Sequence, residues 1–167
     1  MDSLEHEVRL GIRGGKSFNP NIGKMAFDKM LGLLASSKHF EPSKFEDTDS
    51  YISDDVRFSS RNQALEQKTR LTQTDTAMGM FVLRFCIARE QKLKGGIGGR
   101  VVKHTRQKVR HRFSNGLLHI DLTHVKNTDS YEVEIEAEKT YASTHSSEHV
   151  QHYLEAEMRN LVSCANL

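Results

Sequence analysis

Apolar and polar residues alternate along most of this chain, which is the pattern of β-strands whose two faces meet different surroundings. Met80 to Glu90 is the clearest case, because its odd positions are large and apolar while its even positions are smaller and partly charged. Strands are predicted at residues 4–11, 49–52, 56–60, 65–72, 80–90, 102–113, 117–125 and 131–141. The chain is therefore expected to be mainly β.

Two other stretches have the spacing of amphipathic helices. Residues 22–37 carry apolar side chains at helical intervals, and residues 150–162 do the same after a capping sequence that begins at Ser146. Lys38 to Ser50 is polar and is predicted to be irregular. The Asn115-Gly116 pair is predicted to turn a hairpin between two of the strands.

Three of the predicted strands carry like charges at every second position. The strand that starts at Tyr131 places four glutamates on one face, and the strand that starts at Thr105 places four basic residues on one face. Glu5 and Glu7 share a face near the N-terminus. Aligned like charges repel one another, so the acidic faces need either a metal ion or a facing wall of Lys and Arg.

These faces predict the architecture. Eight antiparallel strands with both faces organised are typical of a closed barrel. We expect a mainly β (α+β) fold in which the charged faces point into the barrel and the apolar faces pack outward against two or more helices. Residues 1–167 are expected to form a single domain, since this length is usual for one.

The composition narrows the cellular compartment and the class of function. The formal net charge of +2 argues against binding nucleic acid through bulk charge. Two cysteines make neither a disulfide framework nor a zinc spacing and indicate a reducing compartment. No apolar run is long enough for a membrane span, and the acidic N-terminus is not typical of a secretory signal. We expect an intracellular protein of the nucleus or cytoplasm, or of a viral factory or virion if the source is a virus.

A barrel interior of this kind predicts phosphate chemistry. Clustered carboxylates suit Mg²⁺ or Mn²⁺, and guanidinium and ammonium groups grip a polyphosphate. A metal at the terminal phosphate and a glutamate that orients water together give phosphoanhydride hydrolysis. The residues expected on the basic wall are Arg57, Lys68, Arg84, Arg106, Lys108 and Arg110.

The chain resembles the triphosphate tunnel metalloenzymes, in particular the metal-dependent RNA 5′-triphosphatases of mRNA capping in fungi, protozoa and large DNA viruses. The resemblance covers most of the strand region. The motifs that carry it are Glu5-His6-Glu7, Arg84 with Glu90, Lys108-Val109-Arg110, Asp121-Leu122-Thr123, and the alternating Glu132, Glu134 and Glu136.

This resemblance implies roles and a reaction. Glu5, Glu7 and Glu136 would bind the catalytic Mn²⁺ or Mg²⁺, while Glu134 and Glu90 would orient the attacking water. The basic residues listed above would hold phosphates. Asp121 would position basic neighbours, Glu132 would pair with the basic wall, and Glu138 would be an ordinary exposed charge. The reaction would remove the γ-phosphate of 5′-triphosphate RNA for a guanylyltransferase, on a separate chain or on a removed segment.

The sequence departs from the family at one position and leaves the substrate open. His119 stands where the family usually has arginine, so Arg106 or Arg112 would take over its function or the function would be lost. Arg9 stands where small-molecule relatives carry lysine, which favours RNA. Nucleoside triphosphate and inorganic tripolyphosphate remain alternative substrates. A non-catalytic barrel that binds RNA through an external basic strand is the alternative from another class.

Overall fold

The computed structural model of the chain describes residues 3–15 and 17–167. Within these residues the chain forms nine strands and three helices. The strands are β1 (Ser3–Gly14), β2 (Ser17–Asn19), β3 (Glu41–Tyr51), β4 (Val56–Ser59), β5 (Ala64–Met78), β6 (Phe81–Leu93), β7 (His104–Ser114), β8 (Leu118–Val125) and β9 (Ser130–Ala137). The helices are α1 (Lys24–Ala35), α2 (Lys139–Ser143) and α3 (Ser147–Cys164).

Eight of these strands close into an antiparallel barrel. The order around it is β1-β6-β5-β4-β3-β7-β8-β9, and β9 pairs back with β1. The first and last strands of the sequence therefore seal the barrel, and no edge is left open along this seam. The short strand β2 adds to the end of β1 outside this ring. The closed eight-stranded barrel predicted from the sequence is confirmed.

The apolar core lies outside the barrel, between its wall and the helices. On β1, Val8 and Leu10 are fully buried on the outer face, whereas Glu7 and Arg9 point to the interior. Leu83 and Phe85 of β6 extend this core. Because successive side chains of a strand point to opposite faces, one alternating sequence builds both the core and the charged interior.

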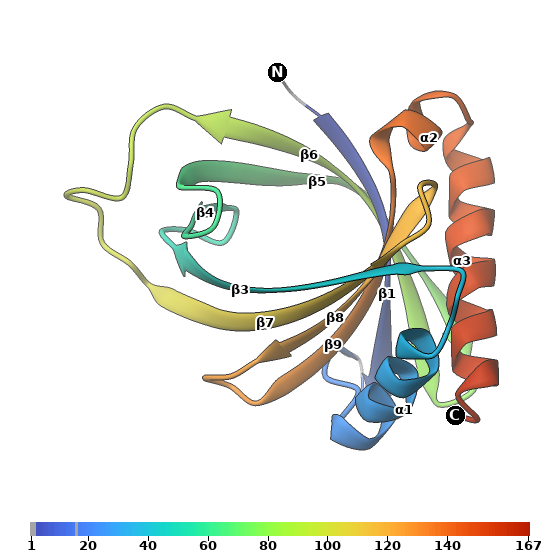
Figure 1. Cartoon of the computed structure of the whole chain (residues 1–167). Coiled ribbons are helices and arrows are strands. Elements are labelled where there is room, and N and C mark those ends of the chain that lie inside the picture. The colour runs from blue at the N-terminus through green and yellow to red at the C-terminus, as the bar shows by residue number, and fades with distance from the viewer. Residues whose placement is uncertain (1–2, 16) are drawn as a thin grey trace.

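The two long helices cover one side of the barrel (Figure 1). Helix α3 begins at its cap Ser146, whose hydroxyl accepts a hydrogen bond from the His149 backbone N–H. Its buried Leu154 and Met158 pack against the outer faces of β1, β9 and β6. Helix α1 packs against β9 and α3. Among the described residues, no helix is long and apolar enough to cross a membrane.

The wall of the barrel therefore has a covered half and a bare half. The covered half consists of β1, β6, β8 and β9, whose outward residues belong to the core. The bare half consists of β3, β4 and β5. In Figure 1, β4 and the adjoining parts of β3 and β5 lie at the left, away from α1 and α3 at the right. Most of β5 beyond Lys68 is exposed. Strand β7 joins the halves, since it pairs with both β3 and β8.

Three local predictions need correction. Residues 38–50 were predicted to be irregular, yet β3 occupies most of them, because a strand of the bare half faces water outside and charge inside. The last strand ends at Ala137, and the next residues form the short helix α2. The first helix begins at Lys24. The hairpin at Asn115 is confirmed: Gly116 adopts the left-handed φ of 89° that such a turn requires.

Candidate active site

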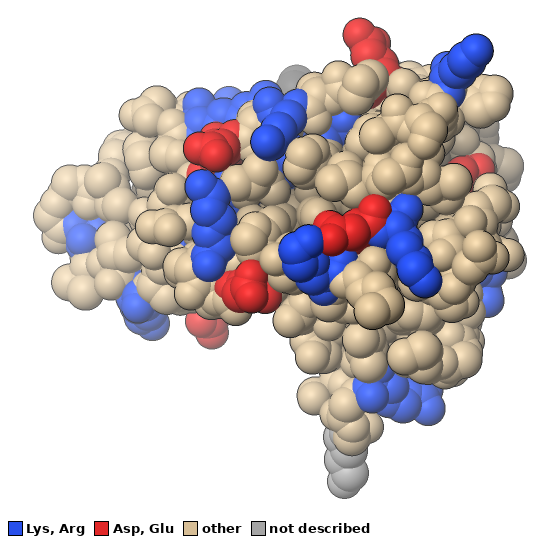
Figure 2. Space-filling view, turned by 60° about the horizontal axis from the view of Figure 1, so that its bottom comes forward, with Lys and Arg blue, Asp and Glu red and all other residues tan. Residues whose placement is uncertain are grey.

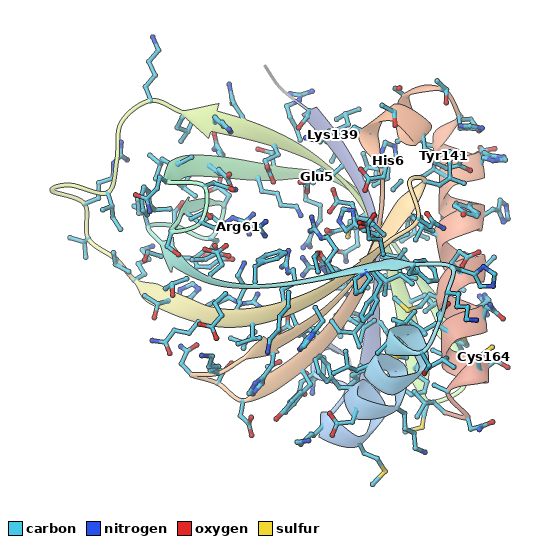
Figure 3. The ribbon with its side chains drawn as sticks, in the orientation of Figure 1. Glu5, His6, Arg61, Lys139, Tyr141 and Cys164 are labelled. Carbon is cyan, nitrogen blue, oxygen red and sulfur yellow. The ribbon has the colours of Figure 1, made fainter. Side chains whose placement is uncertain are left out.

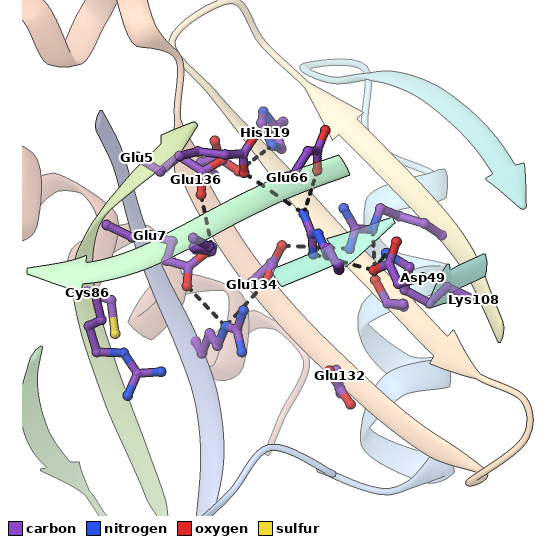
Figure 4. Close-up of a pocket in the computed structure, with 18 of the residues that line it drawn as sticks. Glu5, Glu7, Asp49, Glu66, Cys86, Lys108, His119, Glu132, Glu134 and Glu136 are labelled. Atoms are coloured by element: carbon purple, nitrogen blue, oxygen red, sulfur yellow. Dashed lines mark hydrogen bonds and ion pairs between the residues drawn. The ribbon is translucent and has the colours of Figure 1, made fainter. Parts of the chain in front are cut away.

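The barrel encloses a cavity of about 770 Å³ to which all eight of its strands contribute side chains. Most of the residues that line it are charged or polar, and both signs of charge are present among them. Figure 4 shows how closely these groups approach one another inside the barrel. Charged groups that are removed from water to this degree need partners, so the arrangement of the pairs defines what the cavity can bind.

The acidic part of the cavity lies at the seam between the first and last strands. In the register of β1 and β9, Glu7 lies opposite Glu136, and Arg9 lies opposite Glu134. The Lys68 ammonium from β5 is 2.9 Å from a Glu5 oxygen and 3.1 Å from a Glu7 oxygen. Glu5 points to the barrel interior, whereas its neighbour His6 points to the helices (Figure 3).

Glu5 and Glu90 form a coupled pair of carboxyl groups. Burial, followed by the hydrogen bond and the charge of Glu5, raises the pKa of Glu90 to about 7. Burial also opposes ionisation of Glu5, but Lys68 and the hydrogen bond from Glu90 outweigh it and lower the pKa of Glu5. Burial and the charge of Glu5 together raise the pKa of Glu136. The seam is thus crowded with negative charge.

Glu134 lies deeper, among cations. Arg9 Nε is 3.3 Å from Glu134 Oε2, and Arg110 Nη2 is 4.0 Å from its other oxygen. Burial opposes the charge of Glu134, but Arg9, Arg110 and Lys68 overcome it and hold the pKa of Glu134 well below its usual range. Glu134 is therefore ionised and fixed between two arginines.

His119 is a cation inside the barrel. Its Nδ1 donates to Glu138 at 3.0 Å, and its Nε2 is 3.3 Å from Glu136. Burial would keep the ring neutral, but the hydrogen bond to Glu136 and the charge of Asp121 raise the pKa of His119 to about 9. The histidine is therefore protonated at neutral pH. Glu138, expected to be an ordinary exposed charge, lines the cavity and anchors this ring.

The basic wall is the inner face of β7. Arg106 pairs with Glu132 at 2.6 Å, and Lys108 pairs with Asp49 at 2.6 Å. Farther along the strand, Arg110 and Arg112 both contact one carboxylate. That carboxylate is Asp121 of β8, which is fully buried, 3.2 Å from Arg110 and 2.8 Å from Arg112. Asp121 therefore holds two guanidinium groups toward the cavity, because a buried carboxylate with two cationic partners fixes their planes.

The bare half contributes a second acidic cluster that the sequence did not reveal. Asp49 of β3 is buried between Lys108 and Arg57, with Arg57 Nη1 3.4 Å from Asp49 Oδ2. Arg57 also reaches Glu66 at 3.4 Å and Glu90 at 3.9 Å. The alternation of Asp47, Asp49 and Tyr51 was the available signal, and it was missed because residues 38–50 carry no apolar period.

The expected site residues fall into two groups. The residues that line the cavity are Glu5, Glu7, Arg57, Lys68, Glu90, Arg106, Lys108, Arg110, Glu132, Glu134 and Glu136, with Asp121 directly beneath. Arg84 was also expected there, and this placement is wrong. Its guanidinium makes two hydrogen bonds of 2.9 Å to Asp75 and lies over the ring of Phe18. Arg84 is the cross-strand partner of Arg9 but is not among the residues that line the cavity. Arg9 and Arg112 complete the cationic lining.

The carboxylates of Glu5, Glu7 and Glu136 match the oxygen donors that Mg²⁺ and Mn²⁺ prefer, and their mutual crowding calls for a cation. In the structure the Lys68 ammonium lies between two of them. Over residues 3–15 and 17–167, no group of three or more His, Cys, Asp or Glu side chains has the spacing of a metal site. The donor set therefore fits a divalent ion chemically, and holding one requires Lys68 to turn away.

Comparison with solved structures identifies the class of fold. No protein-family model matches the chain, and no curated protein matches it. The RNA triphosphatase Pct1 of S. pombe has a TM-score of 0.75 at 18% identity in its complex with the Spt5 CTD, over 95% of this chain and 85% of that one. A second Pct1 structure gives 0.71 at 19% identity, over 95% and 80%.

A viral enzyme is also similar to this chain in structure. The triphosphatase of the Mimivirus capping enzyme has a TM-score of 0.57 at 18% identity, over 98% of this chain and 89% of that one. The chain thus shares the triphosphate tunnel fold of these RNA triphosphatases.

Proposed function

We propose that this protein is a metal-dependent polynucleotide 5′-triphosphatase, which hydrolyses the γ-phosphate of 5′-triphosphate RNA in the first step of mRNA cap formation. One observation carries the proposal: the four basic side chains of β7 and the glutamates of β1 and β9 line a single cavity. A polyphosphate needs cations along its length, and its hydrolysis needs carboxylates at one end. The shared fold with RNA triphosphatases supports the same conclusion.

The basic wall binds the substrate. Lys108 and Arg110 project from a rigid strand, and Asp49 and Asp121 fix their positions. Arg106 and Arg57 continue the cationic surface. Each of these cations already has a carboxylate partner. Phosphate oxygens therefore bind to cations whose orientation is fixed before the substrate arrives. Such preorganisation stabilises the charge that develops in the transition state.

The acidic seam serves the metal and the water. Glu5, Glu7 and Glu136 would hold Mn²⁺ or Mg²⁺, which neutralises charge on the γ-phosphate when bound. Lys68 turns from these carboxylates to the phosphate. Glu90 and Glu134 orient the water whose oxygen attacks the γ-phosphorus, and Glu90 accepts its proton. The bond from that phosphorus to the bridging oxygen breaks, leaving orthophosphate and a diphosphate RNA end.

The diphosphate end is the substrate of a guanylyltransferase, which we propose as a partner. The structural neighbours and the motifs of the sequence support RNA as the substrate. Nucleoside triphosphate or inorganic tripolyphosphate hydrolysis is the second candidate, since the cavity would hold any triphosphate. The relative kcat/KM for triphosphate RNA, ATP and tripolyphosphate decides between them.

A barrel that binds RNA through an external basic strand has less support. The basic residues of β7 line the interior and are paired with carboxylates. On the face shown in Figure 2, the Lys and Arg side chains of the described residues are interspersed with Asp and Glu. Salt-sensitive RNA binding without a need for a 5′-triphosphate would favour this alternative instead.

The test measures orthophosphate release from triphosphate-ended RNA with Mn²⁺ or Mg²⁺. We expect Glu136→Gln to lower kcat/KM at least about 100-fold, the loss typical of one electrostatic contact in a transition state. Glu46→Gln is the matched control, because Glu46 is exposed on β3 and pairs with Lys126 outside the cavity. Equal activity of the two variants contradicts the proposed function, as does full activity in a chelator.

A further inference from the structure

Tyr51 stands apart from the other tyrosines of the chain. The sequence contains four, and three of them, Tyr131, Tyr141 and Tyr153, pack against the apolar core. Tyr51 does not belong to that core and lines the cavity instead. Among the described residues of the cavity lining, it is the one phenylalanine or tyrosine. An aromatic side chain that adds nothing to the core and faces a charged cavity calls for a ligand with an aromatic surface.

The strand ends hold this ring in place. Tyr51 is the last residue of β3 and lies opposite His104, the first residue of β7. The two rings are stacked, with centroids 4.5 Å apart and planes 8° from parallel. The Tyr51 carbonyl accepts a hydrogen bond of 2.8 Å from the Lys103 N–H. Tyr51 is therefore a supported platform at one end of the cavity.

Arg57 connects this platform with the acidic seam. Arg57 is the cross-strand partner of Tyr51, and its guanidinium lies 3.9 Å from Glu90, the partner of Glu5. A triphosphate whose γ end lies at the seam therefore passes Arg57 and brings its other end to Tyr51. The group attached to that end of a triphosphate-ended RNA is its first nucleoside.

The turn after Tyr51 supplies a hydrogen-bond acceptor beside the ring. Residues 52–55 connect β3 to β4, and the exposed Asp54 at the turn lines the same cavity. Ribose hydroxyls are donors, and a carboxylate is their natural acceptor. A stacking ring and a carboxylate are of little use to inorganic tripolyphosphate, whereas both fit a nucleoside.

We propose that Tyr51, supported by His104, stacks the first base of the substrate while Asp54 accepts a hydrogen bond from its ribose. This nucleoside subsite rests on the proposed function, and it fixes the direction of the substrate in the barrel. Stacking on an aromatic face is tolerant of sequence, because every base has such a face. The subsite therefore distinguishes nucleotide ends from inorganic polyphosphate without reading the first base.

The experiment compares two short triphosphate-ended RNAs that are identical except that one lacks the base of its first nucleotide. For the unmodified protein we expect kcat/KM to be about 5- to 150-fold higher with the base, the range for one base stacked on an aromatic side chain. In Tyr51→Leu this ratio falls toward 1, and in His104→Ala it falls part of the way. A ratio taken within one variant is insensitive to loss of folded protein.

His124→Ala is the matched control. His124 stacks on Tyr131 with centroids 4.4 Å apart and the same 8° between planes, but this pair lies on the outer face against Phe27 of α1. We expect His124→Ala to keep the full ratio. Equal rates on both RNAs in the unmodified protein overturn the subsite and leave the proposed function standing. If the unmodified protein hydrolyses neither RNA, the proposed function itself is overturned.

Discussion

The outward residues of the covered half are buried beneath α1 and α3, whereas the outward residues of β3 and β5 in the bare half reach solvent. The inner faces of both halves carry charged residues. Hydrophobic burial can therefore hold the covered half together, but it contributes little to the bare half. There, the ladders of backbone hydrogen bonds and the interior ion pairs around Asp49 have to position the strands. In the bare half, the residues that bind substrate and the residues that stabilise the wall are the same.

Asp49→Asn tests this difference most strongly. Lys108 is 6% exposed and Asp49 2%, so the substitution leaves a buried ammonium without its nearest partner. Breaking such a pair typically costs about 3–5 kcal/mol in the free energy of unfolding, which urea titration measures. Glu46→Gln, on the outer face of the same strand, is expected to stay within about 0.5 kcal/mol of the unmodified protein. Equal stability of the two variants would show that interior charge does not hold this wall.

The stability of the covered half is expected to depend instead on its buried apolar volume. Met158 of α3 is fully buried against the barrel, and Met158→Ala should lower the free energy of unfolding by about 2–5 kcal/mol. Leu71 is the matched apolar residue of the bare half and is 45% exposed. Leu71→Ala should cost less than about 0.5 kcal/mol by the same urea titration. A large cost at Leu71 would mean that the bare half has a core contact of its own.

The same contrast explains which elements could be predicted from the sequence. Strand β6 was predicted because Leu83 and Phe85 alternate with smaller residues, and that alternation exists only where an apolar core covers the outer face. Strand β3 has no such core. Its outward Glu46 reaches water and its inward Asp49 reaches other charges, so neither face is apolar. Hydrophobic periodicity reports burial of one face, and a strand exposed to polar surroundings on both sides escapes it.

The candidate site was predictable in its composition and less so in its connections. Glutamates at alternate positions are visible locally, so the carboxylates of β1 and β9 could be assigned to one face. Their partners depend on register between distant strands: Lys68 reaches Glu7 across 61 residues of sequence. Arg84 has the inward parity of its strand and lies opposite Arg9, but it pairs with Asp75 and does not line the cavity. Parity fixes the face of a strand and says nothing of the partner that a long side chain reaches.

The hairpin that joins β7 to β8 links the two halves, and its turn gives a smaller expected effect. Gly116 has φ of 89°, which other residues adopt only at a cost, so Gly116→Ala should destabilise by about 1–2 kcal/mol. Gly32 of α1 is the control: a Cβ there meets open space in a helical backbone. Gly32→Ala should stabilise by about 0.5–1 kcal/mol. Thermal and urea unfolding measure both changes, and a loss of stability at Gly32 would contradict the assignment of strain to backbone conformation.

The smallest effect is expected at the Arg84–Asp75 pair, which bridges β6 of the covered half and β5 of the bare half. Asp75 is 42% exposed, so the pair should contribute at most about 1 kcal/mol to the free energy of unfolding.

The hydrogen bonds from Arg84 hold the pKa of Asp75 below its usual range. The folded protein therefore binds this proton less readily than the unfolded chain does. The contribution of the pair is fully present above the unfolded pKa of about 3.9 and is lost as the pH falls through the lower, folded value. Urea unfolding of the unmodified protein and of Asp75→Asn should show a small difference at pH 7 that shrinks toward pH 3 and in high salt. A difference that stays constant over this range would mean that Asp75 acts through packing and not through its charge.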